Sequence, residues 1–201
     1  GCSMSGSISG FPYFSSAWVD TLGMAEGFAA AQDEGSEVLM DRNDPFSAVI
    51  YDVAIIGGGH AGLAAAEALA RRGQRILLIE RRAALAWECG WALAQDLGEG
   101  GDAGWRAWTG RLAASGGLPG GLPDGAQCEI QAHALVRELG IGLLFYASPV
   151  AVERDNDLIG AVILGTKSGL RRVRARRFID ASDSGELLAV AAIIMCLLFV
   201  T

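Results

Sequence analysis

A glycine-rich turn between two short apolar runs is the feature that most constrains this fold. Tyr51–Ile56 is a β-rich run that ends abruptly at the sequence Gly-Gly-Gly-His-Ala-Gly, residues 57–62. The Ala- and Leu-rich segment Gly62–Arg72 follows, and a second apolar run covers Gln74–Glu80. Short apolar runs bounded by glycines are typical of buried parallel strands. The order strand, turn, helix, strand therefore predicts a βαβ crossover, and with it an α/β fold with a Rossmann-like unit.

The three spaced glycines of this turn fit the GxGxxG pattern. We expect Gly57 to make the tight turn off the strand. Gly59 has no Cβ, so that a diphosphate could approach its backbone, and Gly62 would let the helix pack closely on the strand. GxGxxG on its own is a weak signal, but here the strand, the helix and the second strand are all in place around it. The alternative is a glycine-rich turn that binds no ligand.

Two further features of the unit point to a nucleotide. The N-terminus of the predicted helix, just after His60 and Ala61, would present unpaired backbone N–H groups to phosphates. We expect the backbone of His60 to matter more than its ring. Glu80 ends the second strand, where a carboxylate can accept both hydroxyls of an adenosine ribose. The sequence therefore predicts a dinucleotide site.

A helical insert and three more strands are expected after this unit. Residues 83–127 form a helix-and-loop insert rich in glycine and tryptophan, whose indoles either pack normally or line a groove. A helix begins at Asp124. Leu143–Glu153, Leu158–Gly165 and Leu170–Ile179 have strand composition and are separated by short turns, which predicts a three-stranded antiparallel β-meander.

The two ends of the chain stand apart from the predicted domain, residues 51–189. Residues 1–50 carry seven acidic side chains against one basic one and form a poorly defined extension, with a short helix expected at Thr21–Gln32. Residues 187–201 include an apolar run of 14 residues. A membrane-spanning helix needs about 20 residues. We therefore expect a truncated buried helix, with a membrane anchor as the alternative.

Charge and cysteine usage exclude several classes of function. The net charge is −7, and one basic cluster occurs at strand-like spacing, so that we expect no nucleic-acid partner. The four cysteines form no CxxC pair, which favours free thiols in a cytoplasmic compartment over disulfides or a metal site. Cys89 is followed by no second cysteine before Cys128, which argues against a redox dithiol.

The sequence around the turn resembles a known family. Asp52–Gly62, together with Leu77–Arg81, is similar to the N-terminal FAD fingerprint of the glutathione-reductase-like flavoproteins. Arg177–Ser182 and its continuation to Leu187 resemble the second flavin-contacting turn of the broad group of FAD-dependent oxidoreductases. The resemblance covers about residues 51–189 and implies FAD as the cofactor.

The resemblance also implies positions for the cofactor. The three spaced glycines and Glu80 would hold FAD, with Arg81 near the adenosine and the backbone of Val150 near the adenine. Ala181 and Ser182 would lie along the pyrophosphate and ribityl chain. The sequence departs from the family where Ala86-Trp87 replaces a glycine pair and where Asp183 replaces a glycine.

The implied function is an FAD-dependent oxidoreductase that moves a hydride or electrons between a small organic substrate and FAD. One alternative is a non-catalytic dinucleotide-binding fragment. Another is a tRNA-uridine-modifying flavoprotein, because those proteins often share the Gly-Gly-Gly-His-Ala-Gly sequence. Family members continue beyond the second turn, so we expect this chain to be incomplete at its C-terminus. The sequence assigns no catalytic residue, no metal ligand and no oligomeric state.

Overall fold

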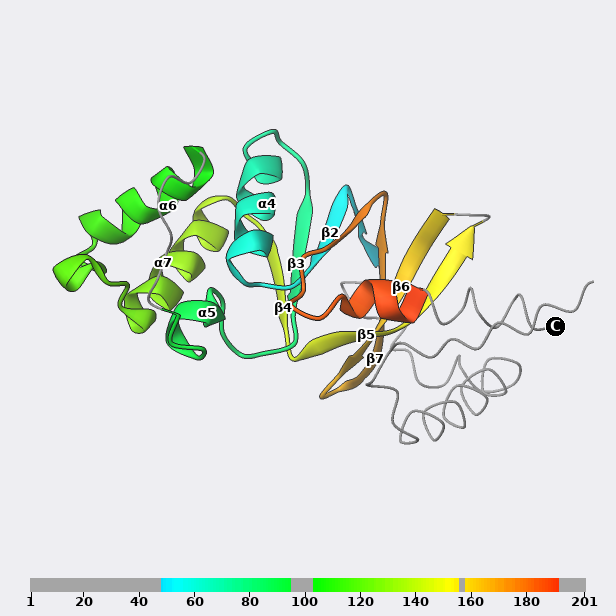
Figure 1. Cartoon of the computed structure of the whole chain (residues 1–201). Coiled ribbons are helices and arrows are strands. Elements are labelled where there is room, and N and C mark those ends of the chain that lie inside the picture. The colour runs from blue at the N-terminus through cyan, green and yellow to red at the C-terminus, as the bar shows by residue number, and fades with distance from the viewer. Residues whose placement is uncertain (1–47, 95–102, 156–157, 192–201) are drawn as a thin grey trace, which may run out of the picture. The chain divides into compact units, whose positions relative to one another are not determined.

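The computed structural model of the chain describes residues 48–94, 103–155 and 158–191 (Figure 1). The chain divides into two compact units, Gly1–Leu39 and Met40–Thr201, and every described residue belongs to the second unit. The helix expected at Thr21–Gln32 and most of the apolar C-terminal run lie outside the described residues.

A four-stranded parallel sheet lies at the centre of the described unit (Figure 1). Its order is β4 (Gly142–Phe145), β3 (Ile76–Glu80), β2 (Val53–Ile56) and β8 (Phe178–Asp180). The helix α4 (His60–Ala70) connects β2 to β3. The predicted βαβ unit, and with it the α/β Rossmann-like fold, is confirmed.

The second sheet contains the predicted meander. Its order is β1 (Ile50–Tyr51), β7 (Gly169–Ala175), β6 (Leu158–Thr166) and β5 (Ala147–Asp155). β5, β6 and β7 pair antiparallel in sequence order, while β1 pairs parallel with β7. The meander thus lies between β4 and β8 in the sequence, and the chain returns from it to the parallel sheet.

Helices from the insert cover the face of the parallel sheet that carries α4 (Figure 1). They are α5 (Trp87–Gly90), α6 (Ala103–Ala114) and α7 (Gly125–Glu138), with the short 3-10 helix η2 at Pro119–Gly121. Asp124 caps α7, because its Oδ1 accepts the N–H of Gln127 at 2.8 Å. Residues 186–191 are also helical.

The central parallel strands β2 and β3 are buried on both faces, which explains their unbroken apolar runs. Alternate residues of β2 point to opposite cores: Val53 and Ile55 join the core under the helices, and Ala54 and Ile56 join the core against the meander. β3 divides in the same way. The result is three layers, namely helices, parallel sheet and meander sheet.

Three of the expected strands are each two strands in the structure. Tyr51–Ile56 divides into β1 and β2, Leu143–Glu153 into β4 and β5, and Leu170–Ile179 into β7 and β8. In each case the chain passes from one sheet to the other within a nearly continuous β-rich run. Because both sheets bury residues in a shared core, the pattern of apolar residues does not show where the chain passes from one sheet to the other.

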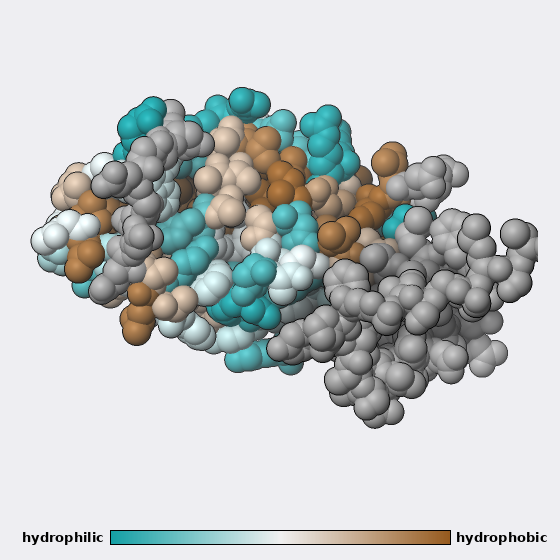
Figure 2. Space-filling model, in the orientation of Figure 1, coloured by the Kyte–Doolittle hydropathy of each residue, from teal (hydrophilic) through white to brown (hydrophobic). Residues whose placement is uncertain are grey.

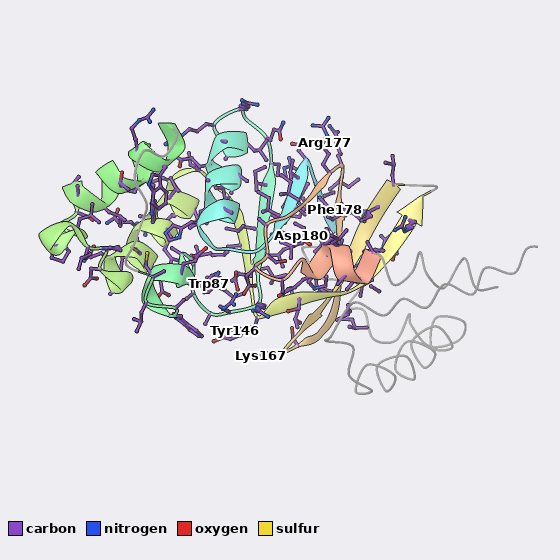
Figure 3. The ribbon with its side chains drawn as sticks, in the orientation of Figure 1. Trp87, Tyr146, Lys167, Arg177, Phe178 and Asp180 are labelled. Carbon is purple, nitrogen blue, oxygen red and sulfur yellow. The ribbon has the colours of Figure 1, made fainter. Side chains whose placement is uncertain are left out.

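The crossing from β4 to β5 occurs at Tyr146, which has a φ of 52°. A left-handed backbone is uncommon for a residue with a bulky side chain. The ammonium group of Lys167 lies 3.6 Å from the centre of the Tyr146 ring, a cation–π contact that helps to hold this conformation (Figure 3). The helix α4 also begins earlier than expected, at His60 and not at Gly62.

The close contact of α4 with the strand before it depends on Gly62. A Cβ at this position would lie only 1.8 Å from the carbonyl oxygen of Gly57. We expect Gly62→Ala to lower the free energy of unfolding by about 2–3 kcal/mol, because backbone must move to relieve the clash.

Gly110→Ala is the matched control. Gly110 lies within α6, and among the described residues no atom beyond the neighbouring helix backbone lies within 4 Å of the position that a Cβ would take there. This substitution should raise the free energy of unfolding by about 1 kcal/mol, since alanine favours helix. Urea denaturation measures both variants, and equal stabilities would contradict the packing role of Gly62.

Candidate functional site

The carboxyl ends of β2, β3 and β8 meet at a topological switch point. β3 lies on one side of β2 and β8 on the other, and both pair parallel with it. In open parallel sheets ligands bind at such a point. A cavity of about 180 Å³ opens there. Six of the predicted site residues line it: Gly57, Ala61, Glu80, Arg81, Ala181 and Ser182.

The turns after β2 and β8 are in backbone contact beside this cavity. Gly57 has a φ of 107°, and a Cβ at this position would lie 2.5 Å from the carbonyl oxygen of Ala181. The Ala181 N–H donates to the carbonyl of Ile56 at 2.8 Å, which extends the strand pairing into the turn. Only glycine satisfies both the positive φ and the close approach.

Glu80 is buried and fixes the glycine turn to the end of β3. Its side chain is 1% exposed. Oε2 accepts the N–H of Gly58 at 2.6 Å, and Oε1 accepts the N–H of Arg82 at 2.8 Å. Oε1 also accepts a bond from Nη1 of Arg82 at 3.3 Å, whereas Oε2 keeps a second acceptor position. Glu80 can therefore hold the turn and still accept a hydroxyl from a ligand in the cavity.

A second carboxylate, which the sequence analysis did not assign, lies at the N-terminus of α4. Oε1 of Glu88 accepts the backbone N–H of His60 at 2.8 Å, and Oε2 lies 3.2 Å from Nδ1 of the same residue. A Cβ on Gly59 would lie 2.3 Å from Oε1. Burial raises the pKa of Glu88, but the interactions with His60 outweigh burial and hold this pKa below its ordinary value.

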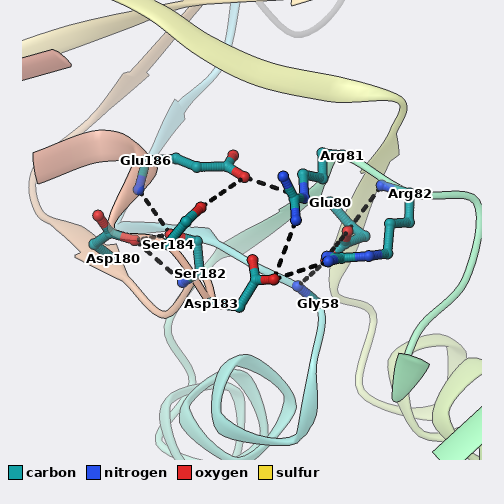
Figure 4. A network of polar contacts seen from close by, with 9 residues as sticks. All are labelled: Gly58, Glu80, Arg81, Arg82, Asp180, Ser182, Asp183, Ser184 and Glu186. Carbon is teal, nitrogen blue, oxygen red and sulfur yellow. Dashed lines mark hydrogen bonds and ion pairs between the residues drawn. The ribbon is translucent and has the colours of Figure 1, made fainter. Parts of the chain in front are cut away.

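The remaining charged groups of the cavity form one network (Figure 4). Asp183 Oδ2 accepts from Arg81 at 3.1 Å and from Arg82 at 2.9 Å, and Glu186 lies 3.2 Å from Nε of Arg81. Although burial opposes it, pairing with the arginines lowers the pKa of Asp183. Arg82 also stacks on Trp87, with its guanidinium carbon 3.9 Å from the ring centre. The acid that replaces the family's glycine is thus neutralised by its neighbours.

Asp180 organises the turn after β8 and was not assigned a role from the sequence (Figure 4). Its Oδ1 accepts from the Ser182 hydroxyl at 2.6 Å, and its Oδ2 accepts the N–H of Leu188 at 2.9 Å. The Ser182 hydroxyl in turn accepts the N–H of Glu186 at 2.8 Å. These bonds cap the helix at residues 186–191 and hold Ala181 and Ser182 against Gly57.

Hydrophilic residues gather beside α5 on the face of the molecule shown in Figure 2. The charged side chains that line the cavity come from residues 80–82 at the end of β3, from α5, and from residues 183–186 after β8. A second cavity, of about 350 Å³ and mostly apolar, is lined by His60, Trp105 and Trp108 among other residues. Of the four tryptophans in the insert, these two therefore line a groove, and Trp87 lines the charged cavity.

Val150 lies apart from both cavities. It is in β5, its side chain is 44% exposed, and it lines neither the charged nor the apolar cavity. Its contact with adenine stays a prediction. The basic cluster noted in the sequence consists of the arginines at residues 171–177. Of these, Arg172 pairs with Glu153 at 2.8 Å and Arg176 lies 3.3 Å from Asp52.

The structure brings Cys89 and Cys128 together, although they are far apart in the sequence. The two thiols interact with each other, and Cys89 Sγ lies 3.8 Å from Nε2 of His60. Both cysteines are free thiols, and the prediction that they form no redox dithiol stays a prediction. Burial raises the pKa of Cys128 to about 12 and also raises that of Cys89, so both stay protonated and poorly reactive.

The described part of the chain shows neither a metal centre nor a membrane span. Residues 48–94, 103–155 and 158–191 contain no cluster of three His, Cys, Asp or Glu side chains placed to hold a metal ion. In the same ranges no helix is both long enough and apolar enough to cross a membrane.

Comparison with known proteins finds matching family models and similar solved structures. Two family models, both described as FAD dependent oxidoreductase, match residues 89–195 and residues 52–115. The first match covers just over half of the chain. No curated protein matches the sequence.

The solved structures show similarity of fold. A triple mutant of the flavin-dependent brominase Bmp2 is 17% identical with a TM-score of 0.50, covering 71% of this chain and 41% of that one. THI4 of Thermovibrio ammonificans is 17% identical with a TM-score of 0.47, covering 87% and 69%. A geranylgeranyl bacteriochlorophyll reductase-like protein of Thermoplasma acidophilum is 18% identical with a TM-score of 0.48, covering 66% and 39%. The chain thus spans less than half the length of two of these three proteins.

The two arginines of the network should differ in their effect on stability. Arg82 is 17% exposed and bonds to buried Glu80 as well as to Asp183, whereas Arg81 is 40% exposed. We expect Arg82→Met to lower the free energy of unfolding by about 2 kcal/mol, because the buried carboxylate loses a charged donor. Arg81→Met should cost less than about 1 kcal/mol, as for exposed ion pairs. Urea unfolding of the two variants makes the comparison, and an equal loss would contradict this ranking.

Proposed function

This chain belongs to the FAD dependent oxidoreductase family, and from that premise we propose that it binds FAD at the carboxyl ends of β2, β3 and β8. The observation that carries the proposal is the backbone contact of Gly57 with Ala181 beside the buried carboxylate of Glu80. It creates a cavity with a helix N-terminus on one side and a ribose-binding acid on the other.

The backbone of the site fits the cofactor. The turn at residues 57–62 has no side chain at its three spaced glycines, and Gly57 and Gly62 leave no room for one. The N–H groups of His60 and Ala61 would face the diphosphate, and Glu80 would accept the ribose hydroxyls. Ala181 and Ser182 would lie along the diphosphate and ribityl chain. One side chain, that of Glu88, lies where the diphosphate would be bound.

Bound FAD would supply the hydride or electron-pair chemistry of an oxidoreductase. The residues of this chain would bind and orient it. Arg81 would lie near the adenosine, and the Arg81–Arg82–Asp183 network would keep the turn after β8 in place. We propose a small organic molecule as the substrate. Its identity depends on the substrate site of the whole protein and not on the fold.

Within the family we propose membership of the glutathione-reductase-like superfamily. Support comes from the Glu80-Arg81 pair at the end of β3 and from the meander inserted between β4 and β8. We also propose a cytoplasmic location, which the free thiols of Cys89 and Cys128 support because such thiols persist in reducing compartments.

A second candidate function is a nucleotide-binding protein that performs no turnover. The observation that favours it is the altered turn after β8, where Asp183 replaces the family's glycine and lines the cavity. An enzyme assay separates the two candidates only after a substrate is known. A binding experiment tests the site that both share.

The test is retention of FAD by the purified chain. FAD is added, free ligand is removed by gel filtration, and the flavin absorption that elutes with the protein is measured. We expect the wild type to retain FAD, and Gly59→Val to raise the dissociation constant by at least about 100-fold, since its side chain would enter the diphosphate position.

Gly110→Val is the matched control, because in the described part of the chain only the neighbouring helix backbone lies within 4 Å of the Cβ position at Gly110. It should bind FAD as the wild type does. Circular dichroism confirms that each variant is folded. Normal retention by the Gly59 variant would place the FAD site elsewhere, and no retention by the folded wild type would overturn the proposed function.

A further inference from the structure

The N-terminus of α4 already holds an anion, and that anion belongs to the chain itself. The Glu88 carboxylate accepts the first backbone N–H of the helix, that of His60, at 2.8 Å. A Cβ on Gly59, on the side from which a diphosphate would approach, would lie 2.3 Å from the same carboxylate oxygen. Glu88 therefore occupies the space that the glycine turn leaves open.

The backbone around Glu88 fixes it in this position. Ala86, immediately before α5, has a φ of 50° and donates its N–H to the carbonyl of Gly58 at 3.0 Å. At the other end of α5, Gly90 is in backbone contact with α7, because a Cβ on Gly125 would lie 2.5 Å from the Gly90 Cα. α5 is thus held at both ends.

In the contacts that the structure gives for Glu88, no arginine pairs with its carboxylate. Arg81 pairs with Asp183 and Glu186, and Arg82 pairs with Glu80 and Asp183. Glu88 instead faces His60, through its ring and its backbone N–H. A diphosphate at this helix end would meet an ionised carboxylate at short range.

We propose that Glu88 is a built-in competitor for the phosphate position, and that a dinucleotide binds only by displacing its carboxylate from the His60 N–H. This inference rests on the proposed FAD site. A helix N-terminus favours one negative group close to its free N–H groups. Carboxylate and diphosphate cannot both take the His60 N–H, so the free chain is held in a self-occupied state and its nucleotide affinity is reduced.

The test is the affinity of Glu88→Gln for FAD and for ADP, measured by isothermal titration calorimetry on the full chain. The amide keeps an acceptor for the His60 N–H but removes the charge. We expect the variant to bind both ligands about 10-fold more tightly than the wild type, because the diphosphate no longer displaces an anion. Adenosine, which carries no phosphate, should bind the two proteins with the same affinity.

Glu186→Gln is the matched control. It removes one negative charge from the same cavity, but Glu186 pairs with Arg81 and accepts no bond from the start of α4. We expect it to change FAD affinity by less than about threefold, because the charge of Glu186 is already balanced by Arg81. If both variants tighten binding equally, the net charge of the cavity and not the position of Glu88 is responsible, and the proposal is wrong.

The remaining outcomes separate the two claims. If the wild type binds FAD and Glu88→Gln binds it equally well or more weakly, Glu88 is only a structural cap and the inference fails while the FAD site stands. If neither folded protein binds FAD or ADP, both the inference and the proposed function are overturned. If only the variant binds FAD, the inference is supported and the proposal that the wild-type chain binds FAD is overturned.

Discussion

The contact between the turns after β2 and β8 is the constraint on which the rest of the site depends. Gly57 can lie against the Ala181 carbonyl only because it has no Cβ, and this contact closes the switch point of the parallel sheet. It brings residues from the two ends of the domain to one cavity. Glu80 strengthens the arrangement from β3, and Asp180 strengthens it from β8 through Ser182. The site is therefore built largely from backbone, and its side chains fix that backbone in place.

The charges of the cavity fall into two groups. In one, carboxylates pair with arginines, and in the other, the Glu88 carboxylate binds the N-terminus of α4. Around Asp183 and Glu186 the carboxylates are balanced by arginines, so an acid that departs from the family pattern costs little. At the start of α4 the balance comes from the helix end itself, which Glu88 occupies. The same physical feature that makes the turn a phosphate site, a row of free N–H groups, makes it attractive to a nearby carboxylate.

Local pattern predicted the βαβ unit and the meander, because each depends on residues close together in the sequence. The lining of the cavity joins residues far apart in the sequence, and of these Ala181 and Ser182 were predicted by the family resemblance. The switches of sheet at Tyr146 and between β7 and β8 were missed, since strands on both sides of each switch bury the same kinds of side chain. Glu88 at the helix end and the Cys89–Cys128 contact were also missed. Both depend on how the insert packs against α4 and α7, which no periodicity encodes. Glu88 directly follows Ala86-Trp87, the pair that replaces the family's glycines. This departure from the family was the signal that could have identified Glu88.

The central claim is that FAD binds where the ends of β2, β3 and β8 meet, and hydrogen–deuterium exchange of the chain with and without saturating FAD tests it most directly. We expect slower exchange of the backbone amides at residues 57–62 and 181–183, where the two turns touch. Exchange in β6, in the outer sheet, should be unchanged. Protection confined to residues 104–108 at the apolar cavity, or no protection by FAD anywhere, would contradict it.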